Sequence, residues 1–499
     1  MLYESTRGRH GLVSPAEAIK LGISPDGGLF VPAGNVTVSG KQLEIMAGLS
    51  YREKAVLILK EFLSGFPEEE IKACVDLAYA PGKFDAPGIA PVCKLDASLY
   101  VLELWHGPTC AFKDMALQIL PHLLTRAAAM TGEEQTIVIL VATSGDTGKA
   151  ALEGFKNVPG TKIIVFYPEQ GVSEVQKLQM VTQEGENVAV VAVRGNFDDA
   201  QAGVKSIFGD REFNRELIKG GYRLSSANSI NWGRLVPQIV YYFSAYLDLM
   251  AKGEIGPGEK VNFAVPTGNF GNILAAYYAS EMGLPVNRLI CASNANNVLT
   301  DFIRTGVYNR NRPFQKTISP SMDILISSNL ERLLYHLCGR DSARVRGWME
   351  ELNKNGSYRI DERTRNLIAG IFWAGFAGDD ETVETIRSVY RRYGYVVDTH
   401  TAVGLNVYEK YRATTGDGTK TILASTASPF KFNESVARAI LGEEAVRGKG
   451  ELELLEVLSA ASGVAVPPGL KNLAAKPVLH TKSTPKERMK ETVRDILKP

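Results

Sequence analysis

The sequence has few cysteines and almost no net charge. Its five cysteines are widely separated and form no CxxC pair, which argues against a disulfide framework or a thiolate zinc site and favours a reducing compartment. The 56 Lys and Arg residues nearly balance the 55 Asp and Glu residues, giving a net charge of +1. Because nucleic-acid binders usually carry a clustered basic excess, no nucleic-acid partner is expected.

Long apolar runs are also missing. The most apolar long segment, residues 239–250, is interrupted by Ser244 and Asp248 and is shorter than the ~20 residues of a membrane span. The first ten residues carry charges where a signal peptide needs an apolar stretch. The six histidines show no metal-ligand spacing. We therefore expect a cytoplasmic protein with no membrane, no metal and no obligate protein partner.

The pattern that is present is alternation of strands and helices. Apolar residues make up 45% and charged residues 22% of the 499 residues, as in soluble proteins of several domains. Four continuous apolar, β-rich runs are separated by segments of helical spacing; the runs are residues 99–104, 136–142, 162–167 and 187–193. This pattern predicts an α/β fold in which helices flank parallel sheets.

The same rhythm returns later in the chain. A strand is expected at residues 261–265, a helix from Gly271 and another strand at residues 288–292. We expect a long loop over residues 304–321 and a helical block over residues 329–393. The expected domains are an N-terminal cap (1–98), a smaller α/β domain (99–215), a large α/β domain (216–481) and a C-terminal helix (482–499).

One lysine stands in unusual surroundings. Lys113 follows a predicted strand and lies in residues 106–114 (HGPTCAFKD), among apolar residues that begin a helix. Desolvation there would lower its pKa, as a Schiff-base nucleophile or general base requires. An ordinary surface lysine at a helix N-terminus is the alternative.

Two glycine turns each join a strand to a helix. Residues 143–148 (TSGDTG) and 266–272 (PTGNFGN) place backbone N–H groups at helix N-termini, where anions bind. Neither turn matches a nucleotide P-loop or a GxGxxG fingerprint. A simple tight turn remains the alternative for each.

A third segment is rich in hydrogen-bond donors. Residues 225–234 (SSANSINWGR) end in Arg234, whose planar guanidinium suits a phosphate or carboxylate. A second anion site and an ordinary capped loop are both compatible with it. Residues 425–429 (STASP) follow another predicted strand and leave hydroxyl groups at its end.

Together these segments resemble the threonine synthases, which are pyridoxal-phosphate enzymes of fold type II. The resemblance runs through most of the chain and is closest to the microbial and fungal branch with a long N-terminal cap. The segments that carry it are YESTRG (3–8), DGGLFVP (26–32), HGPTCAFKD (106–114), TSGDTG (143–148), NSINWGR (228–234), PTGNFGN (266–272), MDILISSN (322–329), DTHTAVG (398–404) and STASPFKF (425–432).

The resemblance implies roles for particular residues. Lys113 matches the lysine that holds pyridoxal 5'-phosphate, Asp146 lies near the ring hydroxyl, and Thr426 faces the pyridine nitrogen. The residues that match the cofactor-phosphate loop are Gly268, Asn269, Phe270, Gly271 and Asn272. The residues that match the substrate site are Ser144 and Thr147 for the carboxylate, and Asn228, Ser229, Asn231 and Arg234 for the phosphate.

The implied reaction converts O-phospho-L-homoserine and water to L-threonine and phosphate, the last step of threonine biosynthesis. One departure is that the family's TAHPAKF has Ser428 and Phe430 at two positions here, which alters polarity and substrate fit beside Thr426. A serine or threonine dehydratase and a cofactor-free binding protein are the alternative functions.

Overall fold

Two mostly parallel sheets form the frame of the protein, as the sequence predicts. The computed structural model describes residues 1–143 and 145–498. In order across the six-stranded sheet, the strands are β13 (Phe372–Phe376), β10 (Val286–Ser293), β9 (Val261–Pro266), β14 (Thr421–Ser425), β4 (Leu99–Glu103) and β3 (Val92–Lys94). Only β3, at the edge, runs antiparallel to its neighbour in this sheet.

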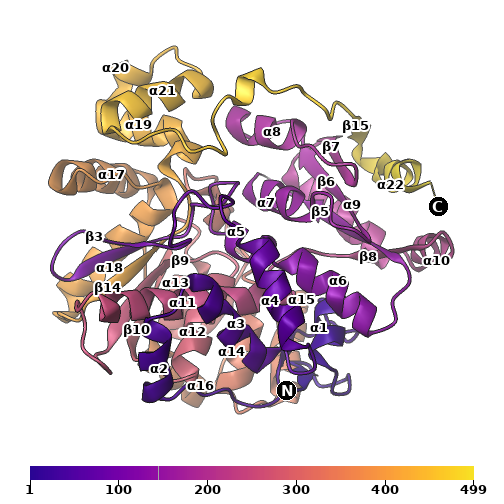
Figure 1. Ribbon diagram of the computed structural model, residues 1–499, viewed down its shortest axis with the longest axis horizontal. Coiled ribbons are helices and arrows are strands. Elements are labelled where there is room, and N and C mark those ends of the chain that lie inside the picture. Colours follow the sequence, from indigo (N-terminus) through magenta and orange to yellow (C-terminus); the bar gives the residue numbers. More distant parts are fainter. Residues whose placement is uncertain (144, 499) are drawn as a thin grey trace.

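The five-stranded sheet is parallel throughout the described residues. Its strands, in order, are β15 (Ser483–Pro485), β7 (Val188–Arg194), β6 (Thr161–Pro168), β5 (Thr136–Ala142) and β8 (Tyr222–Ser225). Figure 1 shows the two sheets beside each other, with α5 (Asp114–Leu117) between them. The central strands are buried on both faces, which explains their continuous apolar sequences.

The helices cover the faces of the two sheets, and the long helix α11 (Trp232–Ala251) is buried along most of its length. No helix among the described residues is both long and apolar enough to cross a bilayer.

The remaining helices before α11 are α1 (Pro15–Leu21), α2 (Gly40–Ala47), α3 (Tyr51–Phe62), α4 (Glu68–Ala78), α6 (Leu120–Met130), α7 (Asp146–Phe155), α8 (Glu174–Val181), α9 (Phe197–Gly209) and α10 (Arg211–Lys219). Those after it are α12 (Gly271–Glu281), α13 (Val298–Thr305), α14 (Leu330–Leu337), α15 (Ser342–Asn355), α16 (Glu362–Ile371), α17 (Asp379–Tyr393), α18 (Thr399–Thr415), α19 (Asn433–Leu441), α20 (Glu443–Val446), α21 (Glu451–Ser462) and α22 (Met489–Leu497). The short 3-10 helices are η1 (Pro320–Met322), η2 (Pro429–Phe432), η3 (Leu473–Ala475) and η4 (Lys486–Arg488).

The N-terminal region packs on the rest of the molecule through its helices. Its strands β1 (Tyr3–Ser5) and β2 (Phe30–Pro32) pair antiparallel. Helices α2 and α3 contact α11, and α1 contacts α6. The aromatic rings of Tyr3 and Phe62 lie against Trp232 at the start of α11, with ring centroids 5.4 and 5.6 Å away. This packing braces the helix that carries Arg234.

The later part of the chain differs from expectation in two places. The expected helical block over residues 329–393 is interrupted by β12 (Ser357–Arg359) and β13, and β13 forms the edge of the six-stranded sheet. The expected loop over residues 304–321 contains β11 (Val307–Asn309), which pairs with β12. These strands are short, so helical spacing in the neighbouring sequence obscures them.

The sheets draw on distant parts of the chain. Strand β4 lies in the six-stranded sheet, whereas β8 and β15 join the five-stranded sheet. The C-terminal segment returns to that sheet, where Met489, Val493 and Leu497 of α22 are buried. Figure 1 shows it as the yellow end of the chain beside β7. The strands of each sheet come from several of the expected segments. The four domain boundaries stay a prediction.

Candidate active site

The site forms where the carboxyl ends of strands from both sheets meet. Strand β4 leads to Lys113, β5 to Asp146, β9 to the loop of residues 268–272 and β14 to Thr426. Parallel strands place such connections at one edge, which is where α/β sheets bind ligands. The fold thus gathers motifs that lie hundreds of residues apart in the sequence.

A backbone bridge holds Lys113 beside the segment after β14. Ala111 pairs with Ala427, and the Phe112 amide donates to the Thr426 carbonyl at 2.8 Å. The Lys113 side chain is 9% exposed, and its Nζ donates to the Ser321 hydroxyl at 3.2 Å. Burial lowers the pKa of Lys113, as the apolar sequence around it predicts.

Asp146, the first residue of α7, lies next to this amine. Its Oδ2 is 3.5 Å from Lys113 Nζ and accepts from the Ser321 hydroxyl at 3.3 Å. Its Oδ1 lies 2.7 Å from Lys431 Nζ and accepts from Gln176 at 2.9 Å. Burial alone would raise the pKa of Asp146, but the charges of Lys431 and Lys113 hold it well below its usual range. Asp146 is therefore a buried carboxylate that can only accept hydrogen bonds.

The turn that contains Asp146 is held by packing and by one hydroxyl group. Thr143 Oγ1 accepts from the amides of Gly145 and Gly148, both at 3.0 Å. A Cβ at Gly145 would lie 2.6 Å from the Gln176 side chain, so the close packing there requires glycine. Thr147 is half-buried in the first turn of α7. Ser144 lies outside the described residues.

The glycine loop after β9 packs closely against the turn that carries Ser321. A Cβ at Gly268 would lie 2.7 Å from the Ser321 carbonyl oxygen. Phe270 has a left-handed backbone (φ 63°) and precedes the first residue of α12, while Asn269 is exposed. The Ser327 hydroxyl donates to the Gly268 carbonyl at 2.8 Å. The loop conformation is thus supported by contacts from residues 321–329.

Asn272 lies in the first turn of α12 with an unused donor. Its Oδ1 accepts from the hydroxyls of Tyr241 and Tyr242. Its Nδ2 is buried and has no hydrogen-bond partner among the described residues. A buried N–H group without an acceptor is costly, so this atom marks a position for an acceptor atom of a ligand.

The donor-rich segment before α11 places a buried guanidinium near the same site. Arg234 is 6% exposed, and its Nη1 donates to the Ala227 carbonyl at 2.7 Å. Within the described part of the chain no carboxylate forms an ion pair with it, and desolvation lowers its pKa to about 10. A buried cation of this kind is stabilised by an anionic ligand.

The other residues of this segment differ in what they offer a ligand. Ser229 is half-buried and accepts from Asn329 Nδ2 at 3.2 Å, whereas Asn228 is exposed. Asn231 caps α11 by accepting from the Gly233 amide at 2.8 Å, and its Nδ2 donates to the Ile19 carbonyl at 3.0 Å. Both ends of the Asn231 side chain are therefore already used within the chain.

Ser321 and Lys431 are site residues that the sequence analysis did not single out. A buried pair fixes the Ser321 turn, because His400 Nε2 accepts from the Ser321 amide at 3.1 Å and its Nδ1 contacts Asp398 at 2.9 Å. An imidazole that accepts at Nε2 and donates at Nδ1 is neutral. The signal available in the sequence was that Ser321 precedes MDILISSN and Lys431 lies inside STASPFKF, two of the segments that carry the family resemblance.

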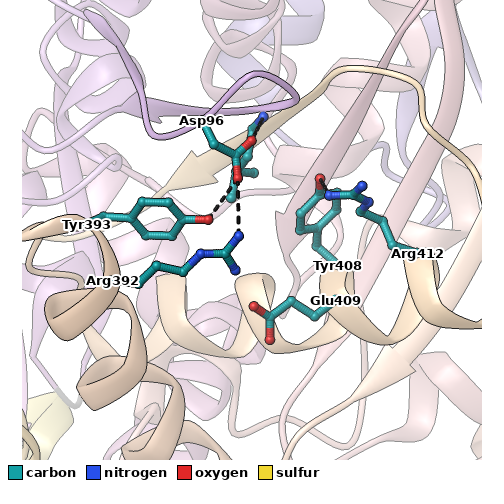
Figure 2. A pocket seen from close by; sticks show the side chains of 7 residues that line it. Asp96, Arg392, Tyr393, Tyr408, Glu409 and Arg412 are labelled. Carbon is teal, nitrogen blue, oxygen red and sulfur yellow. Dashed lines mark hydrogen bonds and ion pairs between the residues drawn. The ribbon is translucent and has the colours of Figure 1, made fainter.

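A separate cavity of about 150 Å³ lies at the amino end of β4, away from the carboxyl ends of the strands that form the site. It is next to Leu99, the first residue of β4, and Figure 2 shows Asp96, Arg392, Tyr408 and Glu409 around it. In Figure 2 Asp96 already contacts Arg392 and Tyr393. No group of three or more metal-ligating side chains occurs in the described ranges.

Family models match three consecutive stretches of the chain. They are described as threonine synthase N terminus (residues 2–79), pyridoxal-phosphate dependent enzyme (84–371) and threonine synthase, C-terminal (401–493).

The similar proteins include enzymes of comparable length and several longer relatives. Threonine synthase of Pseudomonas aeruginosa is 39% identical over 89% of this chain and 91% of its own length. Human threonine synthase-like 1 is 40% identical over 85% of this chain, but the match spans only 58% of that protein.

Solved structures agree with the sequence matches. The crystal structure of PLP-bound threonine synthase from Brucella melitensis has a TM-score of 0.89 and 38% identity and covers 100% of both chains. The yeast threonine synthase structure also has a TM-score of 0.89, with 34% identity, and covers 100% of this chain and 99% of the other. The chain therefore belongs to the threonine synthase family of pyridoxal-phosphate dependent enzymes.

Proposed function

We propose that this chain converts O-phospho-L-homoserine and water to L-threonine and phosphate, with pyridoxal phosphate as its cofactor. The observation that carries the proposal is one buried lysine beside two separate segments that offer hydrogen-bond donors suited to an anion, the loop of residues 268–272 and the segment of Arg234. A phosphorylated cofactor and a phosphorylated substrate together require two such segments.

The loop of residues 268–272 fits the cofactor phosphate. Asn272 Nδ2 is a buried donor without an acceptor, and the loop ends at the N-terminus of α12, where backbone N–H groups and the helix dipole favour an anion. Gly268 keeps the backbone open at the point where Ser321 approaches. We assign Gly268, Asn269, Phe270, Gly271 and Asn272 to this phosphate.

Lys113, Asp146 and Thr426 are assigned to the rest of the cofactor. When bound, pyridoxal phosphate supplies a ring that accepts electron density from carbon atoms of the substrate. Lys113 Nζ would hold the cofactor covalently and, once released, can take up and return a proton as a base. Asp146 would accept a hydrogen bond near the ring hydroxyl. The neutral Thr426 hydroxyl can contact the ring nitrogen without forcing its protonation.

The substrate would be held at both of its ends. Arg234 and Ser229 are assigned to its phosphate, because a buried guanidinium binds a phosphate strongly. Asn228 and Asn231 of the same segment are assigned to this phosphate as well, and Asn231 also caps the helix that carries Arg234. Thr147, with Ser144 assigned from the sequence alone, would bind the carboxylate. Enclosing the substrate keeps water away until it is needed for addition to the substrate.

Charge and cysteine usage support a proposal about the cellular compartment. All five cysteines are free thiols in the structure, which supports a reducing compartment, and we propose the cytoplasm. The balanced charge supports a small-molecule substrate, with no nucleic-acid, membrane or obligate protein partner.

The proposal is tested by measuring which substrate the purified, cofactor-loaded protein consumes. We expect release of one phosphate and formation of one threonine per O-phospho-L-homoserine, with far slower turnover of serine or threonine. Borohydride reduction followed by peptide mapping should place the cofactor on Lys113, and Lys113→Ala should abolish both labelling and turnover.

Each alternative function predicts a different result. Faster turnover of serine or threonine than of O-phospho-L-homoserine would make the protein a dehydratase. A wild-type protein that retains no pyridoxal phosphate and shows no label on Lys113 would be a cofactor-free binding protein. Either result would overturn the proposal.

A further inference from the structure

Two buried lysines share one carboxylate in the site. Lys431 Nζ lies 2.7 Å from Asp146 Oδ1, and Lys113 Nζ lies 3.5 Å from Asp146 Oδ2. The side chains of Lys431, Lys113 and Asp146 are 0%, 9% and 4% exposed. Two protonated amines would leave this cluster with an excess positive charge away from water, which is unfavourable.

The contacts indicate which amine keeps its proton. Lys431 is close to Asp146 and also donates to the Thr109 carbonyl at 2.9 Å, so both neighbours are acceptors that require a donor. Lys113 has the longer distance to the carboxylate and one hydrogen bond to the Ser321 hydroxyl. Deprotonating Lys113 therefore removes the excess charge and weakens fewer close contacts than deprotonating Lys431 would.

We propose that Lys431 is a positioning residue that occupies the Asp146 carboxylate, so that Lys113 stays an uncharged, nucleophilic amine before the cofactor binds. The inference rests on the proposed function, in which Lys113 bonds to the cofactor. Only an unprotonated amine can attack an aldehyde carbon. Asp146 without Lys431 would draw a proton onto Lys113 and make it unreactive.

The charges around Lys113 act in the direction that this proposal requires. Burial lowers its pKa most, the negative charge of Asp146 on α7 raises it, and the positive charges of Lys431 on η2 and Arg234 on α11 lower it again.

Three further titratable groups lie near this cluster. One is the Cys110 thiol, whose pKa is raised by burial and lowered by the charge of Lys431. His400 on α18 contacts the Ser321 amide. Asp114 on α5, whose pKa burial raises to about 6, is close enough for the charge of Lys431 to oppose that rise. Asp146 is thus the group beside Lys113 that pulls a proton toward it, and Lys431 lies 2.7 Å from Asp146.

A second buried lysine provides a matched control. Lys149 on α7 lies 3.1 Å from Glu153 and also contacts Gln183. Among the described residues, no second amine forms an ion pair with Glu153. Replacing Lys149 removes a buried lysine from the helix that carries Asp146, without altering the Asp146 cluster.

The test measures the protonation of Lys113 in cofactor-free protein. Competitive labelling with acetic anhydride over a pH series, read by peptide mass spectrometry, gives the midpoint at which Lys113 becomes reactive. We expect Lys431→Met to raise this midpoint by at least about one pH unit, a tenfold loss of neutral amine at pH 7, and Lys149→Met to leave it unchanged. An unchanged midpoint in folded Lys431→Met protein would overturn the proposal.

A double variant separates charge from structure. Adding Asp146→Asn to Lys431→Met removes the carboxylate, so the midpoint should return toward the wild-type value. Damage caused only by lost packing would persist in the double variant, which would contradict the proposal.

If Lys431→Met does not fold, Asp146→Asn alone gives the answer. With the carboxylate gone and Lys431 still charged, the midpoint of Lys113 should fall below the wild-type value, and a rise or no change would refute the proposal. Labelling needs no cofactor, so its outcome is independent of the proposed function. Failure of the wild-type protein to bind pyridoxal phosphate at Lys113 would instead refute that function.

Discussion

The two proposed phosphate sites are built from different groups. The loop of residues 268–272 offers backbone amides, a helix N-terminus and the neutral Asn272 amide, whereas the segment before α11 offers the buried guanidinium of Arg234. Neutral N–H donors cost little free energy to remove from water, and they bind a phosphate through the positions in which the loop holds them. A buried charge without a carboxylate partner recognises the ligand chiefly through its charge.

This difference suits two phosphates with different fates. In the proposed reaction the cofactor phosphate stays in place, so a loop whose shape is fixed by contacts with Ser321 and Ser327 would be sufficient. The substrate phosphate would enter and leave in every turnover, and the hydrogen bond from Arg234 to Ala227 would hold the guanidinium in place between turnovers. If the comparison is correct, variants of the two sites should fail in separable ways.

Among variants of the two phosphate sites, the largest effect is expected from Arg234→Ala. Removing one partner of a buried charge pair costs about 2–5 kcal/mol, so kcat/KM for O-phospho-L-homoserine should fall by about 10³. Cofactor affinity should change little, because the loop of residues 268–272 is untouched. Steady-state kinetics and a cofactor titration measure the two quantities separately. Arg234→Lys should lie between the variant and the wild type, because it keeps the charge but loses the planar fork.

A loss of cofactor affinity equal to the loss of kcat/KM would contradict this separation. It would mean that Arg234 supports the whole site instead of one phosphate.

A smaller effect is expected from Gly268→Ala. The added Cβ would lie 2.7 Å from the Ser321 carbonyl oxygen, and overpacking of this kind costs about 1–3 kcal/mol. Cofactor affinity should fall by about tenfold to a hundredfold, whereas KM for the substrate at saturating cofactor should stay near wild type. Equilibrium dialysis of pyridoxal phosphate measures the first quantity, and initial rates measure the second.

Gly271→Ala is the matched comparison for this variant. Its Cβ would meet Asn329 Nδ2 at 3.4 Å, an ordinary contact, so the loss of cofactor affinity should be smaller. A greater loss at Gly271 than at Gly268 would show that the approach of Ser321 does not determine the shape of the loop.

Sequence reasoning located the parts of this site that are local. A strand followed by a glycine turn and a helix can be read within ten residues, and β5–α7 and β9–α12 both have this form. The alternating pattern also placed these turns at one edge of parallel sheets. The fold class and the positions of Lys113, Asp146 and Asn272 at the ends of strands were therefore within reach of the sequence.

Contacts between distant segments were out of reach. Lys431 meets Asp146 across 285 positions of the chain, and Ser321 meets Lys113 across 208, so no local pattern records either pair. The sequence also could not show that Ile19 and Gly233 use both ends of the Asn231 side chain. Which donor remains available to a ligand depends on packing that only the fold establishes.

The smallest effect is expected from Ser229→Ala, at the point where the two sites meet. The Ser229 hydroxyl accepts from Asn329 Nδ2 at 3.2 Å, and Asn329 also donates to the Asn269 carbonyl in the loop of residues 268–272 at 3.1 Å. Because Asn329 keeps this second bond, the loop should hold its shape and cofactor affinity should change less than about twofold. The variant would lose the proposed hydrogen bond between the Ser229 hydroxyl and the substrate phosphate, worth about 1 kcal/mol. KM for O-phospho-L-homoserine should therefore rise about fivefold. Equal losses in both measurements would show that Asn329 couples the two phosphate sites into one.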